Sequence, residues 1–521
     1  MKKRIALLLV GMLLLSGCAG KVVDELSQEL PSAGESGTES AEGSPAQGEG
    51  QETPEGEKGL PFVKIETLNA SRRTDDDETE LAWITWCNVS LSGAGYEKGA
   101  EAVERLLGHT QDEVEKEADA IAADAKEQYE TIKDWGEYSY FAPYTSENIC
   151  EVTRLDSRVL SLRESYYDYT GGAHGYGGEQ GVTIDLQSGL KLELPHMLED
   201  MAGFWSRAEE LVLAELAERE DELFEDYQAT VSQELETTAW YMDGAGIEFC
   251  FNTYAIAPYA SGTIVVCVPY GEVASYMKPE YLNNQEEYVV KLPQNERVQF
   301  VGAGGESMEV AFENRKLDDY SYELYLVLNG QDNPLEGDIW VSSAYLFHRA
   351  NGKTFLVYDF DWASDDYETV VCDVSEGTVN DTDRVGASIG QGSIGLDRLG
   401  LSFIIQILGN HTSGMEYQLT EDGRLEPLEE RYEFVRWGDG DGYGLTLIKD
   451  LPVEVDGAQT VVPAGSMIIL TATDFEGTVW FKTADGSMEG TLYYERDEDG
   501  FPLYIDGVSE YEYFENLPYA G

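Results

Sequence analysis

The chain has 521 residues, and its 34 Lys and Arg against 100 Asp and Glu give a formal net charge of −66. This charge disfavours nucleic-acid binding and adsorption to anionic lipid through side chains, because both require a basic surface. A hydrophobic content of 42% excludes disorder of the whole chain, and the length predicts several domains. The strongly acidic character suits an extracellular setting and favours attraction of cations or basic proteins.

Residues 1–17 have the pattern of a signal peptide. A basic start (Lys2 to Arg4) precedes an apolar run from Ile5 to Leu15, which is too short to span a membrane. The following Leu-Ser-Gly-Cys, which ends at Cys18, resembles the bacterial lipobox, in which the cysteine is acylated and becomes the mature N-terminus. We therefore expect a lipid at Cys18 that anchors an extracytoplasmic protein to the outer face of the cell membrane.

Residues 18–60 are composed largely of Glu, Gly, Ser, Pro, Gln and Thr, with no apolar periodicity. Such a segment cannot bury an apolar face, so we predict a disordered acidic linker between the lipid and the folded part.

The first folded unit is predicted to be an α+β module over residues 62–280, because strands and helices alternate in blocks. Its two subdomains are expected at 61–165 and 166–281. Alternation and turn signals predict strands, and apolar stripes at helical spacing predict two long helices. The strands are expected at 62–68, 81–91, 138–144, 148–156, 159–169, 180–185, 190–194, 246–252 and 263–269, and the helices at 97–132 and 202–235.

Beyond residue 281 the pattern changes to short strands with Asn-Gly, Asp-Gly or glycine-rich turns. We predict a β-rich region at 282–440 and a small barrel with its tail at 441–521. The strand spacing over 443–494 and the Pro-Ala-Gly-Ser turn resemble a bacterial SH3-type barrel. Five cysteines follow Cys18, and Cys250 and Cys267 fall on predicted neighbouring strands. They could form a disulfide, or all five could be small core residues.

Two motifs occur in a defined order within the module. Tyr169 to Gly175 reads YTGGAHG, and Phe251 to Gly262 reads FNTYAIAPYASG, with an Asp185 to Gly189 hairpin between them. This order resembles the extracytoplasmic domain shared by RsiV-type anti-sigma factors and the N-terminal part of PdaC-type peptidoglycan deacetylases. The resemblance covers about residues 62–280. In the RsiV type this domain binds lysozyme, so the resemblance implies protein recognition.

The chain also departs from both relatives. A lipoprotein cleaved at Cys18 would have no cytoplasmic segment, so anti-sigma signalling is not expected. PdaC-type deacetylases carry a separate metal-dependent domain with an Asp-Asp pair and an H-x-x-x-H helix. None of the five histidines here has such a partner. We therefore predict a non-enzymatic binding module with no cofactor and no metal.

The candidate binding residues all come from the two motifs: Tyr169, Gly171, Gly172, His174, Pro258 and Tyr259. The alternative is a purely structural role, in which adjacent glycines shape a turn and Tyr259 packs its ring. The expected partner is lysozyme or another basic protein that acts on the cell wall. The alternatives are peptidoglycan, through a wall module associated with an envelope enzyme, and a structural envelope protein without a tight ligand.

Three further patterns are assigned no function. Ser388 lies in a G-x-S-x-G sequence, but the glycine-rich residues that follow cannot open the helix that a nucleophile elbow requires. Acidic residues from Glu495 to Asp506 and from Asp439 to Asp450 have spacings like those of calcium loops. Neither segment has flanking helices, so we expect solvated hairpin turns rather than calcium sites.

Overall fold

The computed structural model describes residues 59–75, 79–133, 141–282, 285–316, 322–335, 339–362, 366–435, 444–497 and 500–519. Residues 58–521 form one compact unit. Cys18, the signal peptide and nearly all of the linker lie outside the described residues. No helix within the described ranges is long and apolar enough to cross a membrane.

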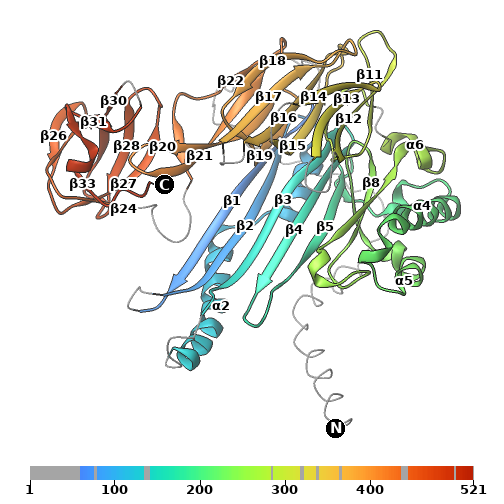
Figure 1. Ribbon diagram of the computed structural model, residues 1–521, viewed down its shortest axis with the longest axis horizontal. Helices are drawn as coiled ribbons and strands as arrows, with labels where there is room; N and C mark the ends of the chain where they lie inside the picture. Colours follow the sequence, from blue (N-terminus) through green and yellow to red (C-terminus); the bar gives the residue numbers. More distant parts are fainter. Residues whose placement is uncertain are drawn as a thin grey trace, which may run out of the picture. The chain divides into compact units, whose positions relative to one another are not determined.

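A sheet of long strands forms the first part of the module (Figure 1). Its neighbouring strands are β1 (Phe62–Arg73), β2 (Glu80–Ser92), β3 (Tyr144–Asp156), β4 (Val159–Tyr169) and β5 (Tyr176–Asp185). The β2–β3 pair is parallel and the other pairs are antiparallel. Helix α2 (Gln111–Ile132) packs on β1 and β2, where Val114 and Ala118 meet Ala70 and Ile84. The opposite face of these strands carries Trp83 and Thr85.

The long helix predicted at 97–132 is wrong as a single element. The chain forms α1 (Glu97–Leu107) and then α2, separated at Gly108. A new N-terminus forms at Thr110, whose side chain accepts a hydrogen bond from the backbone of Glu113 while the Glu113 carboxylate accepts one from the backbone of Thr110. This capping box stabilises a helix start inside what reads as one apolar stripe.

The helix predicted at 202–235 is also divided. Helix α4 (Met201–Leu216) ends in a 3₁₀ segment (Ala217–Glu222), in which Arg219 departs from helical angles, and α5 (Tyr227–Glu234) follows. The acidic run from Glu218 to Glu222 has no buried residue and so gives a continuous helix no packing face. Of the predicted strand at 138–144, residues 138–140 lie outside the described residues. The prediction is wrong for 141–143, which form no strand, and β3 begins at Tyr144.

A three-stranded sheet completes the module beside α4 and α5 (Figure 1). Its strands are β7 (Ala239–Met242), β8 (Gly246–Phe251) and β9 (Ile264–Pro269), and the smaller elements are β6 (Leu190–Lys191), α3 (Leu194–Met197) and α6 (Tyr270–Val273). The fold is therefore mixed α and β up to this point, as the sequence predicted. Cys250 lies opposite Val265 and Cys267 opposite Glu248, so the two cysteines are out of register. All five described cysteines are buried and free.

Strands dominate the rest of the described chain, again as predicted. A first group is β10 (Tyr288–Lys291), β11 (Val298–Val301), β12 (Ser307–Lys316), β13 (Tyr322–Leu328), β14 (Gln331–Leu335), β15 (Ile339–His348), β16 (Thr354–Trp362), β17 (Asp366–Asp373) and β18 (Asn380–Val385). A second group is β19 (Ser388–Gly395), β20 (Arg398–Gln406), β21 (Asn410–Leu419), β22 (Leu425–Pro427) and β23 (Tyr432–Phe434). Strand β10 pairs with both β3 and β15, so it joins the module to the β-rich region. One hydrophobic cluster contains Leu160 from β4, Phe347 from β15 and Leu401 from β20. The domain limits drawn from the sequence stay a prediction.

The last strands pair in the order β33–β24–β27–β28–β29–β25–β26, and β27 also pairs with β23. Their bounds are β24 (Gly444–Leu447), β25 (Leu451–Val455), β26 (Ala458–Val462), β27 (Met467–Thr473), β28 (Thr478–Thr483), β29 (Glu489–Tyr493) and β33 (Phe514–Glu515), with β30 (Glu495–Arg496), β31 (Leu503–Ile505) and β32 (Val508–Ser509) in a separate small sheet. No pairing among the described residues joins β26 to β33, so the SH3-type barrel is not confirmed.

Gly181 on β5 is needed for the approach of β7. A Cβ built at this position would lie 1.8 Å from the carbonyl oxygen of Trp240, which is backbone and cannot move aside cheaply. We expect Gly181→Ala to lower the free energy of unfolding by about 2 kcal/mol, because the two strands must separate. Urea unfolding measures this loss. Gly271→Ala is the control, since a Cβ at Gly271 meets nothing within 4 Å. Equal stability of the two variants would contradict the packing.

Candidate functional site

The first candidate motif forms the tight turn between β4 and β5. Gly171 and Gly172 both have positive φ angles, +95° and +96°, a conformation that side-chain-bearing residues rarely adopt. The hydroxyl of Tyr169 donates a hydrogen bond to the carbonyl of Gly172 at 3.2 Å. The two glycines therefore reverse the chain, and Tyr169 holds the turn closed.

The structure brings His174 from this turn onto Tyr259 from the second motif. Their rings stack with centroids 4.1 Å apart and an interplanar angle of 24°. His174 Nδ1 lies 2.9 Å from the carbonyl oxygen of Gly175, and because a carbonyl only accepts, Nδ1 carries the proton. His174 Nε2 can then accept from the hydroxyl of Tyr254 at 3.4 Å. The imidazole of His174 is exposed, so its outer face remains open to a partner.

Side-chain bonds from the second motif to β5 hold the two motifs together. Asn252 accepts from the backbone N–H of Glu179 at 2.7 Å and donates to the carbonyl of the same residue at 3.0 Å. Thr253 donates to the carbonyl of Gly177 at 3.2 Å. The Asn252 side chain thus imitates a strand partner at the end of β8, and it places the loop that carries Tyr254 and Tyr259 beside the glycine turn.

Tyr254, His174, Tyr259 and Tyr167 form what we call the aromatic turn cluster. The rings of Tyr254 and Tyr259 lie 5.8 Å apart, and Tyr254 is 54% exposed. The hydroxyl of Tyr167 accepts from the backbone N–H of Gly175 at 3.2 Å. Burial, the nearby Tyr167 hydroxyl and its hydrogen bond raise the pKa of Tyr259 above the ordinary tyrosine value, which already lies well above neutral pH. The cluster can stack on a partner and exchange hydrogen bonds with it.

Of the six candidate residues, the structure brings His174 and Tyr259 into contact and makes Tyr169, Gly171 and Gly172 the frame of the turn. Pro258 is exposed and precedes the 3₁₀ turn Tyr259–Ser261. The sequence reasoning missed Tyr254 and Tyr167. Both could have been found from the sequence. Tyr254 lies inside the second motif, and Tyr167 lies two residues before Tyr169, on the same face of the strand.

The other patterns contribute less. Ser388 begins β19, which continues as a strand to Gly395, so the residues after this serine do not form a helix. Within the described ranges, no three His, Cys, Asp or Glu side chains converge as metal ligands. Both acidic loops fall partly outside the described residues, which omit 436–443 and 498–499.

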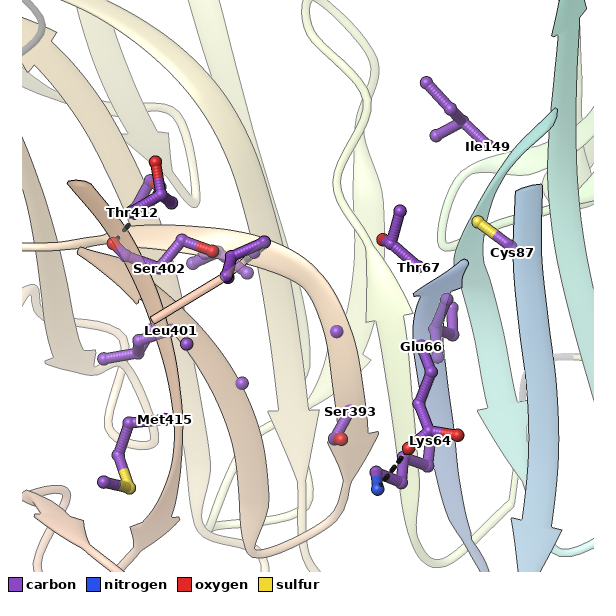
Figure 2. A pocket seen from close by; sticks show the side chains of 18 of the residues that line it. Lys64, Glu66, Thr67, Cys87, Ile149, Ser393, Leu401, Ser402, Thr412 and Met415 are labelled. Atoms are coloured by element: carbon purple, nitrogen blue, oxygen red, sulfur yellow. Dashed lines mark hydrogen bonds and ion pairs between the residues drawn. The ribbon is translucent and has the colours of Figure 1, made fainter. Parts of the chain in front are cut away.

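A cleft of about 1760 Å³ lies between the module and the β-rich region. Figure 2 shows Lys64, Glu66 and Thr67 of β1 on one side and Ser393 of β19 on the other, with Leu401, Ser402, Thr412 and Met415 beyond. Trp83, Thr85 and Glu147 extend its lining across β2 and β3. No sequence pattern indicates this cleft, because its two walls come from segments that are far apart along the chain.

Comparison with protein families identifies the segments that build the aromatic turn cluster. Residues 97–176 match a family described as deacetylase PdaC, and residues 205–271 match a protein family of unknown function, DUF3298. The first match includes the glycine turn and His174, and the second includes Pro258 and Tyr259. The chain carries a PdaC/DUF3298-type module.

Two solved structures are similar to part of this chain. A DUF3298 family member from Bacteroides fragilis is 18% identical, with a TM-score of 0.34, and the match covers 43% of this chain and 96% of that one. A DUF3298 family protein from Pseudomonas aeruginosa is 19% identical, with a TM-score of 0.29, and the match covers 42% of this chain and 95% of that one. No curated protein matches the chain. The family matches at 97–176 and 205–271 confirm the PdaC-type part of the resemblance drawn from the two motifs, and the RsiV assignment stays a prediction. The β-rich region lies beyond both family matches.

Proposed function

We propose that the chain is a non-enzymatic binding protein of the bacterial envelope, anchored by a lipid at Cys18, whose PdaC/DUF3298-type module binds a basic wall-active protein such as lysozyme. The observation that carries this proposal is the stack of the exposed His174 on the half-buried Tyr259, with the exposed Tyr254 beside it. Such preorganised rings resemble the aromatic anchors that dominate protein interfaces, and they lose little conformational entropy on binding.

Charge supports a basic partner. The chain carries a net charge of −66, so a cationic protein is drawn toward it over a range set by the ionic strength. At the surface itself, the faces of Tyr254 and Tyr259 can receive the guanidinium or ammonium group of an Arg or Lys. Charge accelerates the encounter, and the fixed rings supply the specificity.

The chemistry of the cluster favours recognition over catalysis. Its polar atoms are used in holding the turn: the Nδ1 of His174 on Gly175 and the Tyr167 hydroxyl on the Gly175 N–H. An ordinary tyrosine is already protonated at neutral pH, and burial raises the pKa of Tyr259 further, so its surroundings do not activate this phenol as a nucleophile. A surface of this kind binds by stacking and hydrogen bonding.

The test is calorimetric titration of the full chain with lysozyme at about 150 mM salt, where surface attraction is screened beyond roughly 8 Å. An unrelated protein of equal basic charge is titrated in parallel. We expect saturable one-to-one binding of lysozyme alone. Equal binding of both proteins, or of neither, would contradict the proposal, and retention on insoluble peptidoglycan would then favour a wall-binding module.

The double substitution His174→Ala, Tyr259→Ala is expected to weaken lysozyme binding at least tenfold, by roughly 1.4 kcal/mol or more, because it removes both stacked rings. Tyr322→Ala on β13 is the matched control, since Tyr322 is also an exposed ring, at 63%, and lies outside the module. Equal losses in the two variants would place the interface elsewhere.

A further inference from the structure

The cleft beside β1 opens where two paired strands separate. Val63 of β1 pairs with Ile394 of β19, and this is the only pairing between the two strands among the described residues. Going from Val63 toward Asn69, and from Ile394 back toward Ser388, the strands line opposite walls of the same cleft (Figure 2). Beyond this single paired position, β1 and β19 separate and leave a gap in the sheet.

The edge of β1 that faces this gap has unused backbone groups. In an antiparallel pair, successive residues point their N–H and C=O alternately toward and away from the neighbouring strand. The carbonyls of Asn69 and Ser71 accept side-chain bonds from Gln111 and Arg72, from which we infer that the backbone groups of the odd-numbered residues point away from β2. Ile65 and Thr67 share this phase, and within the described residues no strand pairs with them on that side.

On the opposite wall of the cleft, β19 also has residues that do not pair with a neighbouring strand. The register of β19 against β20 shifts between Ile389 and Ile394, so Gly390 to Ser393 are not in the ladder. Gly390, Gly392 and Ser393 all line the cleft. With little side chain on this wall, another backbone can approach it closely.

The charge of the lining indicates which kind of chain would enter. Eight of the lining side chains are acidic and five are basic. The basic ones are largely engaged, since Lys64 pairs with Glu66, Arg398 with Glu416, and both Arg163 and Lys291 with Glu151. Glu147, Glu429 and Glu433 have no ion pair among the described residues, so the cleft presents uncompensated negative charge to an incoming segment.

We propose that this cleft binds an extended segment of a basic polypeptide, which adds as a strand to the free edge of β1 at Ile65 and Thr67. Backbone hydrogen bonds along the edge would give affinity, and lysine or arginine side chains facing the three glutamates would give selectivity. At about 3.3 Å per residue, a bound segment of roughly six residues would form a strand about 20 Å long. The site goes beyond the proposed function and uses none of the aromatic turn cluster.

The test uses the full-length chain and three end-blocked, fluorescein-labelled heptapeptides in fluorescence anisotropy. The first alternates lysine with valine, the second alternates glutamate with valine, and the third alternates lysine with proline. Only the first combines positive charge with a full set of backbone donors. We expect it to bind, the glutamate peptide not to bind, and the proline peptide to bind at least about tenfold more weakly.

Variants locate the site. Thr67→Pro removes the outward N–H of β1 and is expected to weaken the lysine–valine peptide about tenfold, whereas Thr67→Val keeps that N–H and should bind as the unaltered chain does. Glu147→Gln leaves the backbone intact and should weaken binding severalfold, with a smaller salt dependence. Thermal melting of each variant distinguishes lost binding from lost folding.

Hydrogen exchange of the same complex should slow at 65–69 and at 390–393. Equal binding of the lysine–proline and lysine–valine peptides would overturn the proposal, because charge alone would then account for binding. So would unchanged exchange at both segments, or equal affinity of Thr67→Pro and Thr67→Val. A chitin oligosaccharide that protects these segments when no peptide does would assign the cleft to glycan. The double variant His174→Ala, Tyr259→Ala should bind the peptide as the unaltered chain does, because neither residue lines the cleft. The peptide test can therefore fail or succeed whether or not lysozyme binds the aromatic turn cluster.

Discussion

Replacing Arg154 with methionine is expected to lower the free energy of unfolding by about 3–5 kcal/mol, the range found when one partner of a buried ion pair is removed. Arg154 is fully buried on β3, and its guanidinium lies 2.7 Å from the carboxylate of Asp156. It also donates to the Tyr270 hydroxyl at 3.0 Å and to the carbonyls of Tyr281 and Leu282 at 2.8 and 3.0 Å.

The cost follows from what the substitution leaves behind. Methionine fills much of the volume but donates nothing, so two carbonyls lose their donors and the buried charge of Asp156 loses its counter-ion. Because Arg154 joins β3 to α6 and to the segment that leads into β10, the loss affects the junction between the module and the β-rich region.

Chemical denaturation measures this change, with Arg207→Met as the matched control. Arg207 forms ion pairs with Glu210 and Glu272 near the surface, and removal of such pairs typically costs under about 1 kcal/mol. If Arg154→Met lowered the free energy of unfolding by less than about 1 kcal/mol, or if both variants lost equal stability, the buried contacts of Arg154 would not be what stabilises the junction between the module and the β-rich region.

The double substitution Asp243→Asn, Glu248→Gln is expected to stabilise the chain at pH 7 by about 1–3 kcal/mol and to flatten its stability between pH 7 and pH 5. Asp243 lies between β7 and β8, and Glu248 is on β8 with only 4% of its surface exposed. Burial raises the pKa of Asp243 to about 6. Burial, and then the charge of Asp243, raise the pKa of Glu248.

The sign follows from proton binding. A carboxyl whose pKa is higher in the folded state binds its proton more tightly there, so the stability it contributes is full below its unfolded pKa near 4 and is lost as pH rises through its folded value. The chain should therefore become more stable from pH 7 to pH 5. The substituted side chains are neutral throughout, so the variant should lose the part of this pH dependence that Asp243 and Glu248 contribute. Glu215 and Asp359, whose pKa values burial raises to about 7 and about 6, keep their own contributions.

Urea unfolding at pH 5, 6 and 7 provides the measurement, and Glu236→Gln, an exposed acid on the same module, controls for the loss of one negative charge. Asn at position 243 keeps an oxygen that can accept from the N–H groups of Ala245 and Gly246, as Asp243 does at 2.8 and 3.1 Å. A double variant that is less stable than the unaltered chain at pH 7 would show that the two carboxylates are charged and favourable in the fold.

Much of the fold could be predicted because local patterns and packing agree. The alternation predicted at 81–91 is present in β2 from Cys87 to Leu91, whereas Ala82 and Ile84 on the other face are also buried, against α2. The helix over 97–132 was overextended because the capping box at Thr110 and Glu113 competes with a continuous stripe. This box is readable in the sequence, but only when Gly108 is taken as a stop.

The candidate site could be predicted in its parts but not in its geometry. The two motifs suggested a shared role, yet the stacking of His174 on Tyr259 depends on Asn252 binding the edge of β5, a tertiary contact that no local pattern indicates. The cleft could not be predicted from the sequence at all. It exists because β1 and β19, more than 300 residues apart, pair once at Val63 and Ile394 and then separate.

Hydrogen exchange of the full chain with and without lysozyme at about 150 mM salt, followed by mass spectrometry, tests whether lysozyme binds the aromatic turn cluster. If lysozyme binds the aromatic turn cluster, exchange should slow at 171–176 and 253–260, the two segments that carry this cluster, and should not change with an equally basic unrelated protein. Unchanged exchange in both segments, or the same protection by the unrelated protein, would contradict binding at this cluster.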